Sequence, residues 1–275
     1  MSPVVWLDGR LLDASEARVS PFDHGLLTGD GVFETLRVYR GVPFATGRHL
    51  DRLARSAAVL GLDAPGPDVL RPAMAEVVEA NRLSAGRLRV TVTGGPSPLG
   101  PARGRGAPTV IVAGGPMARW PETADVAVAP WPRNERSPLV GAKTTSYAEN
   151  VVALAWAEAR GAGEAVFANL AGHLCEGTGT NVFLVVGGRL VTPPLSSGCL
   201  GGVTRELLCE LVDVEEADVG VEVLAEASEA FLSSSTREVQ PIATVDRRPL
   251  LSAPGPRTAE AAAAFRALVG ADLDP

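Results

Sequence analysis

Lys143 is the residue of this chain whose chemistry no other residue can supply. The sequence has 275 residues and 25 basic side chains, of which Lys143 is the only lysine and 24 are arginine. Arginine stays protonated in proteins, whereas a buried lysine can lose its proton, attack a carbonyl carbon and form an imine. A drift towards arginine codons would spare a lysine that arginine cannot replace. The alternative is a surface lysine that survived by chance.

Two further segments could serve the same chemistry. The segment GCLGGVTRELL, residues 198–208, runs from a glycine-rich loop into a predicted helix, where Thr204 adds a hydroxyl. The N–H groups at such a helix start bind phosphate, although an ordinary helix cap has the same pattern. Glu176, in CEGTGTNVF, is either a solvated charge or an acid that keeps a pyridine nitrogen protonated. A lysine amine, a phosphate loop and such an acid together suit pyridoxal phosphate.

Other function classes have less support. His24, His49 and His173 match no metal-ligand spacing, so we expect no metal. The chain has no G-x-S-x-G elbow, and its three cysteines cannot form a disulfide framework. A net charge of -7 without a basic run argues against nucleic acid and anionic membranes. Without a signal-like N-terminus or a membrane-length apolar stretch, we expect a cytoplasmic protein.

The periodicity of apolar residues predicts both helices and strands. Predicted helices span 47–62, 68–82, 146–163, 203–212 and 256–269, and predicted strands span 4–12, 32–44, 87–95, 108–115, 124–131, 164–169, 172–177, 180–194 and 229–235. Because these elements do not alternate regularly, they indicate an α+β protein with two lobes. We expect a small N-terminal α/β domain at 1–116, a linker at 117–123 and a larger domain at 124–275, with a frayed tail after residue 269.

Several motifs in this order resemble the fold-type IV pyridoxal-phosphate enzymes, also called class IV aminotransferases. FDHGLLTGDGVFETLRVYRG, HLDRLARSAAVLG, GAKTTSYAENVVAL and EGTGTNVFLVVGGRLVTPPLSSGCLGGVTRELL carry the resemblance, which covers nearly the whole chain. It implies a larger C-terminal domain with a barrel-like mixed sheet, a small-molecule amino substrate, and a homodimer.

The resemblance also implies roles for individual residues. Lys143 would form the Schiff base with pyridoxal phosphate and carry protons, and Glu176 would pair with the pyridine nitrogen. Tyr147 would lie near the phenolic oxygen of the cofactor. Arg52 would bind the phosphate through its guanidinium fork. The remaining cofactor contacts implied by the resemblance come from Val203, Thr204, Ser235 and Thr236.

The resemblance leaves the reaction open between two classes. The short chain, GGPSPLG and KTTSYAENVVAL favour 4-amino-4-deoxychorismate lyase, which makes 4-aminobenzoate and pyruvate for folate biosynthesis. The alternative is an aminotransferase for branched-chain or D-amino acids with a 2-oxo acid acceptor. The D-amino-acid enzymes hold the substrate carboxylate with an Arg-x-His pair, but Leu99 occupies the arginine position here. Arg103 or Arg105 could bind that carboxylate instead.

A third hypothesis is a non-catalytic binding or regulatory protein on the same fold. The joint presence of Lys143, Glu176 and Arg52 argues against it.

Overall fold

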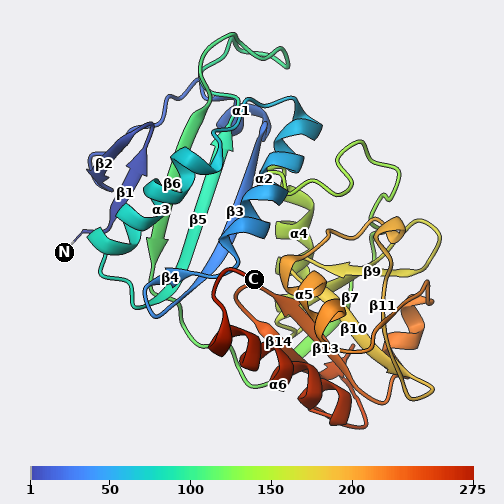
Figure 1. Ribbon diagram of the computed structural model, residues 1–275. Coiled ribbons are helices and arrows are strands. Elements are labelled where there is room, and N and C mark those ends of the chain that lie inside the picture. The colour runs from blue at the N-terminus through green and yellow to red at the C-terminus, as the bar shows by residue number, and fades with distance from the viewer. Residues whose placement is uncertain (1) are drawn as a thin grey trace. The chain divides into compact units, whose positions relative to one another are not determined.

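The computed structural model describes residues 2–275, which form two compact units (Figure 1). Unit 1 contains residues up to 118 together with 142–147 and 272–275, and unit 2 contains 119–141 and 148–271. The short segment that carries Lys143 therefore packs within unit 1, although it lies far along the chain from the rest of that unit. The domain limits expected from the sequence stay a prediction.

Unit 1 is built on a six-stranded antiparallel sheet with the order β2-β1-β6-β5-β3-β4. Helices α2 and α3 lie across one face of this sheet (Figure 1). The elements of unit 1 are β1 (Val4–Leu7), β2 (Arg10–Asp13), α1 (His24–Thr28), β3 (Gly31–Tyr39), β4 (Val42–Pro43), α2 (Thr46–Leu60), α3 (Pro67–Ala80), β5 (Ala85–Thr93) and β6 (Thr109–Gly115).

Strand β3 presents alternate residues to the helices, because successive side chains of a strand point to opposite faces. Val32, Leu36 and Val38 are fully buried and join the core that α2 and α3 cover. Glu34 stands in the same phase of the strand and is also fully buried. A carboxylate therefore occupies a position where the pattern calls for an apolar side chain.

Unit 2 contains a mixed sheet of nine strands with helices packed beside it. The path β12-β11-β10-β13-β14-β7-β8-β9 includes parallel pairs, and β15 pairs with β14. The elements are β7 (Ala124–Val128), α4 (Ala148–Glu158), β8 (Glu164–Ala168), β9 (Leu174–Gly177), β10 (Asn181–Val186), β11 (Arg189–Thr192), η1 (Leu195–Ser197), α5 (Val203–Leu211), β12 (Glu215–Glu216), η2 (Val221–Ala225), β13 (Ala230–Ser234), β14 (Glu238–Val245), β15 (Arg248–Pro249) and α6 (Pro256–Ala271).

The fold agrees with the expected α+β architecture, and each of the five predicted helices is present within a few residues of its expected limits. The prediction missed the short elements α1, β12 and β15, and it differs from the structure in two further places. Strand β14 was absent from the prediction, because Glu238 with a positive φ and Pro241 interrupt its apolar pattern. The tail does not fray, since Asp274 binds Arg71 and the Gly47 N–H, and the Leu273 carbonyl accepts from Ala45.

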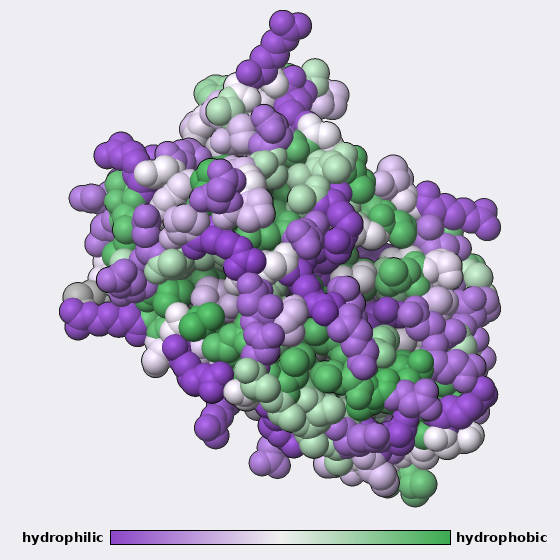
Figure 2. Space-filling model, viewed as in Figure 1, coloured by the Kyte–Doolittle hydropathy of each residue, from purple (hydrophilic) through white to green (hydrophobic). Residues whose placement is uncertain are grey.

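Among residues 2–275, no helix is long and apolar enough to cross a membrane. Figure 2 shows hydrophilic and hydrophobic residues interspersed over the visible face of the molecule.

Gly95, in the loop that follows β5, has a backbone conformation and a close backbone contact that only glycine fits. Its φ is +68°, and a Cβ there would overlap the carbonyl oxygen of Ala107. We expect Gly95→Ala to lower the free energy of unfolding by about 3 kcal/mol, because left-handed strain adds to a backbone overlap. Gly41→Ala is the matched control, with φ +79° and the nearest atom 3.9 Å away, and should cost about 1 kcal/mol. Equal losses in urea unfolding would contradict this account.

Candidate active site

The Lys143 segment is fixed to unit 1 through its backbone. The carbonyl of Lys143 accepts from the Phe33 N–H at 3.0 Å, and Thr144 forms an antiparallel bridge with Val32. The N–H of Lys143 donates to the hydroxyl of Ser56 on α2, also at 3.0 Å. Strand β3 and helix α2 therefore hold the lysine at its backbone from two sides.

Two cations lie against the ring of Phe33. The Lys143 Nζ is 4.6 Å from the ring centroid, and the Arg89 guanidinium carbon is 3.6 Å from it. Tyr147 meets the same ring edge to face at 5.5 Å. The ring and the Thr91 hydroxyl, which accepts from Arg89 Nε at 3.2 Å, orient the Arg89 guanidinium. Sequence reasoning overlooked Arg89, because a strand arginine has no motif of its own.

A buried carboxylate connects β3 to α2 within unit 1. Glu34 accepts hydrogen bonds from Arg52 Nε at 2.7 Å, from Arg52 Nη2 at 2.6 Å and from His49 Nδ1 at 2.6 Å. All three residues are at least 95% shielded from solvent. His49 and Arg52 are three residues apart on α2, so both face the strand. The predicted phosphate ligand Arg52 is thus held by a fork-to-fork ion pair.

The charges in this cluster follow from burial and pairing. Burial alone would raise the pKa of Glu34, but the Arg52 guanidinium and then His49 outweigh it and lower that pKa to about 2. Burial lowers the pKa of His49 despite the nearby carboxylate. We therefore assign a neutral imidazole whose Nδ1–H donates to Glu34, so the cluster holds one anion and one guanidinium.

Glu176 lies on β9 of unit 2, where its carboxylate contacts Leu200 and Arg133. One oxygen accepts from the Leu200 N–H at 2.8 Å, and the other is 3.3 Å from Arg133 Nε. The Arg133 guanidinium stacks on Phe167 at 4.2 Å and donates to Asn150. An N–H donor and a guanidinium are the usual partners of an ionised carboxylate.

A second buried carboxylate, Glu164, supports the turn after Glu176. It accepts from the N–H and the hydroxyl of Thr178, and Arg237 lies 3.3 Å away. Burial raises the pKa of Glu164, while Arg237 and Thr178 counteract this. Sequence reasoning missed Glu164 and Arg237, because nothing in the local pattern links residues so far apart in the chain.

The predicted phosphate loop of unit 2 leads into helix α5 and is held by side-chain contacts. Helix α5 begins at Val203, and no side chain caps its N-terminus. The loop is held close, since Asn181 donates to the Leu200 carbonyl and a Cβ on Gly202 would overlap the Asn181 side chain. Val203 and Thr204 are buried, whereas Ser235 and Thr236 are half-buried in the turn between β13 and β14.

The protein-family comparison gives a match to amino-transferase class IV over residues 31–245. The chain belongs to the class IV aminotransferases. It is 34% identical over 256 residues to a Methanocaldococcus jannaschii protein provisionally named a branched-chain-amino-acid aminotransferase, with 89% of this chain and 88% of that protein covered. It is 31% identical over 263 residues to the D-alanine aminotransferase of Bacillus licheniformis, covering 92% of this chain and 93% of that one.

Solved structures agree with this membership. The branched-chain aminotransferase of Thermoproteus uzoniensis has a TM-score of 0.91 and 35% identity to this class IV chain, covering 98% of this chain and 95% of the other. Another branched-chain aminotransferase, solved with pyridoxamine 5'-phosphate, gives a TM-score of 0.91 at 26% identity, with 98% of this chain and 94% of the other covered. The predicted family, fold type and cofactor class are confirmed.

One prediction is wrong. The lyase acting on 4-amino-4-deoxychorismate, and with it the place in folate biosynthesis, has no support among these relatives, which are named branched-chain or D-alanine aminotransferases. The lyase prediction depended on the short chain, GGPSPLG and KTTSYAENVVAL, and none of these contains a residue assigned to a step that only the lyase performs. The aminotransferase alternative has the support instead.

The roles predicted for Arg103 and Arg105 stay predictions. Arg103 donates to both oxygens of Asp30, at 2.7 and 2.6 Å, and to the carbonyls of Leu60 and Gly61. These bonds fasten the loop after β5 to Asp30, which follows α1, and to the C-terminus of α2. Arg105 is exposed.

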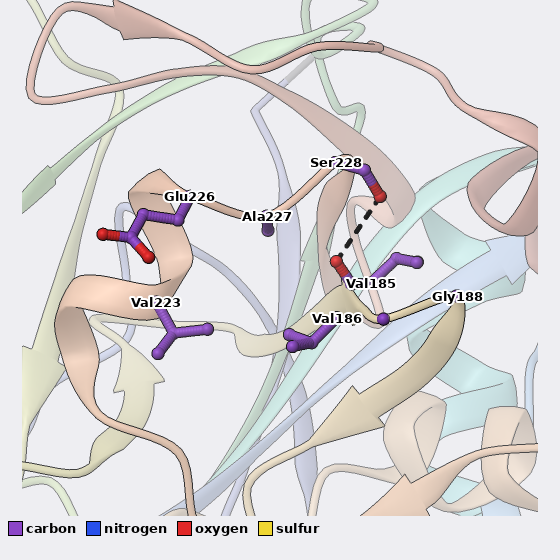
Figure 3. A pocket seen from close by; sticks show the side chains of 8 residues that line it. Val185, Val186, Gly188, Val223, Glu226, Ala227 and Ser228 are labelled. Carbon is purple, nitrogen blue, oxygen red and sulfur yellow. Dashed lines mark hydrogen bonds between the residues drawn. The ribbon is translucent and has the colours of Figure 1, made fainter.

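One pocket of about 360 Å³ lies in unit 2 at the turn between β10 and β11 (Figure 3). Its walls are Val185–Gly188, Val223 and Glu226–Ser228, and they include none of the predicted site residues. The hydroxyl of Ser228 is turned to the Val185 carbonyl at 3.4 Å (Figure 3). Among residues 2–275, no group of three His, Cys, Asp or Glu could hold a metal ion.

The depressed pKa of Glu34 predicts a pH dependence of stability. The folded-state pKa of about 2 lies below the ordinary 4.5, so ionised Glu34 contributes stability above pH 4.5 that is lost as the pH falls towards 2. We compare His49→Gln with the double variant Glu34→Gln/His49→Gln, so that the imidazole does not titrate. Because Arg52, the main cause of the low pKa, remains in both variants, their difference in unfolding free energy should shrink by roughly 1 to 2 kcal/mol between pH 7 and pH 3. A constant difference in urea unfolding would contradict the ionised, buried Glu34.

Proposed function

We propose that this chain is a pyridoxal-phosphate-dependent aminotransferase that moves an amino group from a branched-chain amino acid to a 2-oxo acid. Its membership of class IV and the names of its relatives support the reaction. The observation that carries the proposal is that Ser56, one turn after Arg52 on α2, binds the backbone N–H of Lys143.

The residues present in unit 1 fit this cofactor. The aldehyde and the phosphomethyl group of pyridoxal phosphate are attached to neighbouring ring carbons, so the lysine and the phosphate ligand must lie close together. Ser56, which anchors the Lys143 backbone, follows Arg52 by four residues on α2. Side chains four apart lie one above the other on a helix. The backbone of Lys143 and the guanidinium of Arg52 are thus held by neighbouring turns of α2.

The residues of unit 2 supply the other donors and acceptors. We propose that the carboxylate of Glu176 pairs with the pyridine nitrogen, which lies across the ring from the aldehyde carbon. Within unit 2, the N–H groups at the start of α5, the hydroxyl of Thr204 and the Ser235–Thr236 turn are the phosphate ligands that we propose. Free N–H groups at a helix N-terminus and a guanidinium fork both suit a phosphate dianion. Tyr147 would face the phenolic oxygen.

Bound pyridoxal phosphate supplies an electron sink for the carbon from which a proton is removed. Lys143 would hold the cofactor through Nζ. A neutral Nζ would accept the proton from the substrate carbon that bears nitrogen and would later return a proton. Phe33 and Tyr147 orient Nζ for this transfer, and Glu176 keeps a proton on the pyridine nitrogen.

The substrate carboxylate needs a cation beside the carbon that loses its proton. Arg89 is that cation in our proposal, because its guanidinium and the Lys143 Nζ contact the same Phe33 ring. The absence of an arginine at Leu99 favours the branched-chain class over the D-amino acids. The 31% identity to a D-alanine aminotransferase makes D-alanine the second substrate to test.

Lys143→Arg tests the cofactor assignment. The variant keeps the charge but removes the only side-chain amine, so the protein should lose its visible absorption band and the label fixed by borohydride. Turnover should fall by roughly a thousandfold or more. The control Lys143→Arg/Arg55→Lys restores a lysine on the exposed side of α2 and should recover neither band nor turnover. Full activity in either variant would refute the role of Lys143.

Arg89→Gln tests the substrate assignment. The variant should lower kcat/KM for branched-chain amino acids with a 2-oxo acid by roughly tenfold to a hundredfold, the usual value of a charged hydrogen bond. Arg87→Gln changes an exposed arginine two residues away on the same face of β5 and should leave kcat/KM unchanged. Both enantiomers and D-alanine are assayed with the wild-type chain, and exclusive activity with D-alanine would overturn the branched-chain assignment.

Assembly as a homodimer and a cytoplasmic location stay predictions. The mass of the purified protein by light scattering decides the first.

A further inference from the structure

Glu34 is the least expected residue of unit 1 on physical grounds. Its neighbours in the same strand phase, Val32, Leu36 and Val38, are buried and apolar, and Glu34 has no exposed surface. A buried ion pair is a poor source of stability, since apolar side chains of similar size commonly serve the fold as well or better. Stability alone therefore gives no reason for a carboxylate at this position.

The geometry of the ion pair suggests what the carboxylate does. Glu34 accepts from Nε and Nη2 of Arg52 and so takes one edge of the guanidinium. A guanidinium has five N–H donors in one plane, and the second edge, formed by Nη1 and Nη2, points away from the first. When one edge is fixed, both the plane and the direction of the other edge are fixed.

His49 fixes the carboxylate itself. Its Nδ1 lies 2.6 Å from the Glu34 oxygen that also accepts from Arg52 Nη2. His49 and Arg52 come from one helix, whereas Glu34 comes from β3, so the three bonds set the sheet and the helix in a single register. The carboxylate cannot rotate without losing one of these bonds. The guanidinium cannot rotate without losing one of its two bonds to Glu34.

We propose that Glu34 is a positioning residue that aims the outer edge of the Arg52 guanidinium at the cofactor phosphate. The inference rests on the proposed function, in which Arg52 binds that phosphate. Glu34 does not touch the cofactor and acts only through Arg52, with His49 as its support.

Two effects of Glu34 on phosphate binding have opposite signs, which makes the proposal testable. As a negative charge near the site, Glu34 repels a phosphate dianion, so its removal would tighten binding. As a positioning residue, it keeps the guanidinium oriented, so its removal weakens binding. The direction of the change in affinity shows which effect is larger.

The experiment measures the dissociation constants of pyridoxal phosphate and of pyridoxal, which lacks the phosphate, by absorption titration of the apoprotein. Glu34→Gln is nearly isosteric with wild type and removes the charge. We expect its dissociation constant for pyridoxal phosphate to rise by roughly tenfold or more, with that for pyridoxal unchanged. A loss that was merely structural would weaken both ligands equally.

A double-variant cycle shows whether Glu34 acts through Arg52. In an Arg52→Gln background, the additional Glu34→Gln change should not weaken the affinity for pyridoxal phosphate further, because there is no guanidinium left to aim. Only the repulsion between Glu34 and the phosphate is then removed, which leaves the affinity equal or higher. Glu34→Asp keeps the charge with a shorter reach and shifts the ratio of the two affinities in the same direction but less. This variant serves the same test if Glu34→Gln does not fold.

The outcomes separate this inference from the proposed function. If the wild-type chain binds pyridoxal phosphate and transaminates, but Glu34→Gln and Glu34→Asp bind it as tightly or more tightly, the positioning role is refuted and the function stands. An equal loss for both ligands refutes the role as well. If the wild-type chain binds no pyridoxal phosphate, both proposals fail together.

Discussion

The carboxylate of Glu34 joins strand β3 to helix α2 inside unit 1, and the candidate chemistry of that unit is arranged around this bond. Arg52 is clamped by it, and Ser56, one helical turn further on, anchors the backbone of Lys143. Because a buried charge must be paired, Glu34 and Arg52 cannot separate without leaving an uncompensated ion in the core. The requirement for pairing thus fixes where the helix presents its polar residues to a ligand.

The alternation of β3 divides the unit into a supporting side and a reacting side. Glu34 points to the helices, while Phe33, its neighbour in sequence, points to the opposite face and meets both Lys143 and Arg89. Adjacent residues of β3 therefore have different partners. Glu34 holds Arg52, the proposed phosphate ligand, and Phe33 orients the amine of Lys143. A shift of one residue in the register of β3 would turn Glu34 away from α2 and Phe33 towards it.

The motifs predicted the family and misled us about the reaction. An amine, a carboxylate and a phosphate loop serve the removal of a proton, which aminotransferases and lyases share, so the same residues suit both classes. What separates the two is how the substrate is held after that step, and short motifs say little about it. The orientation of Arg89 beside Lys143 bears on that question, and it depends on strand pairing.

By itself, the sequence determined the family, the two-lobed α+β fold, the helices with strong periodicity and the identity of Lys143 as the only amine side chain. These rest on local patterns and on residue chemistry, which a linear reading contains. It did not determine the partners of buried charges, because Glu34 with Arg52 and Glu164 with Arg237 meet across 18 and 73 residues of chain. The tertiary structure also decided that the tail is held and that β14 forms, since neighbouring strands and side chains satisfy backbone groups that local propensity leaves open.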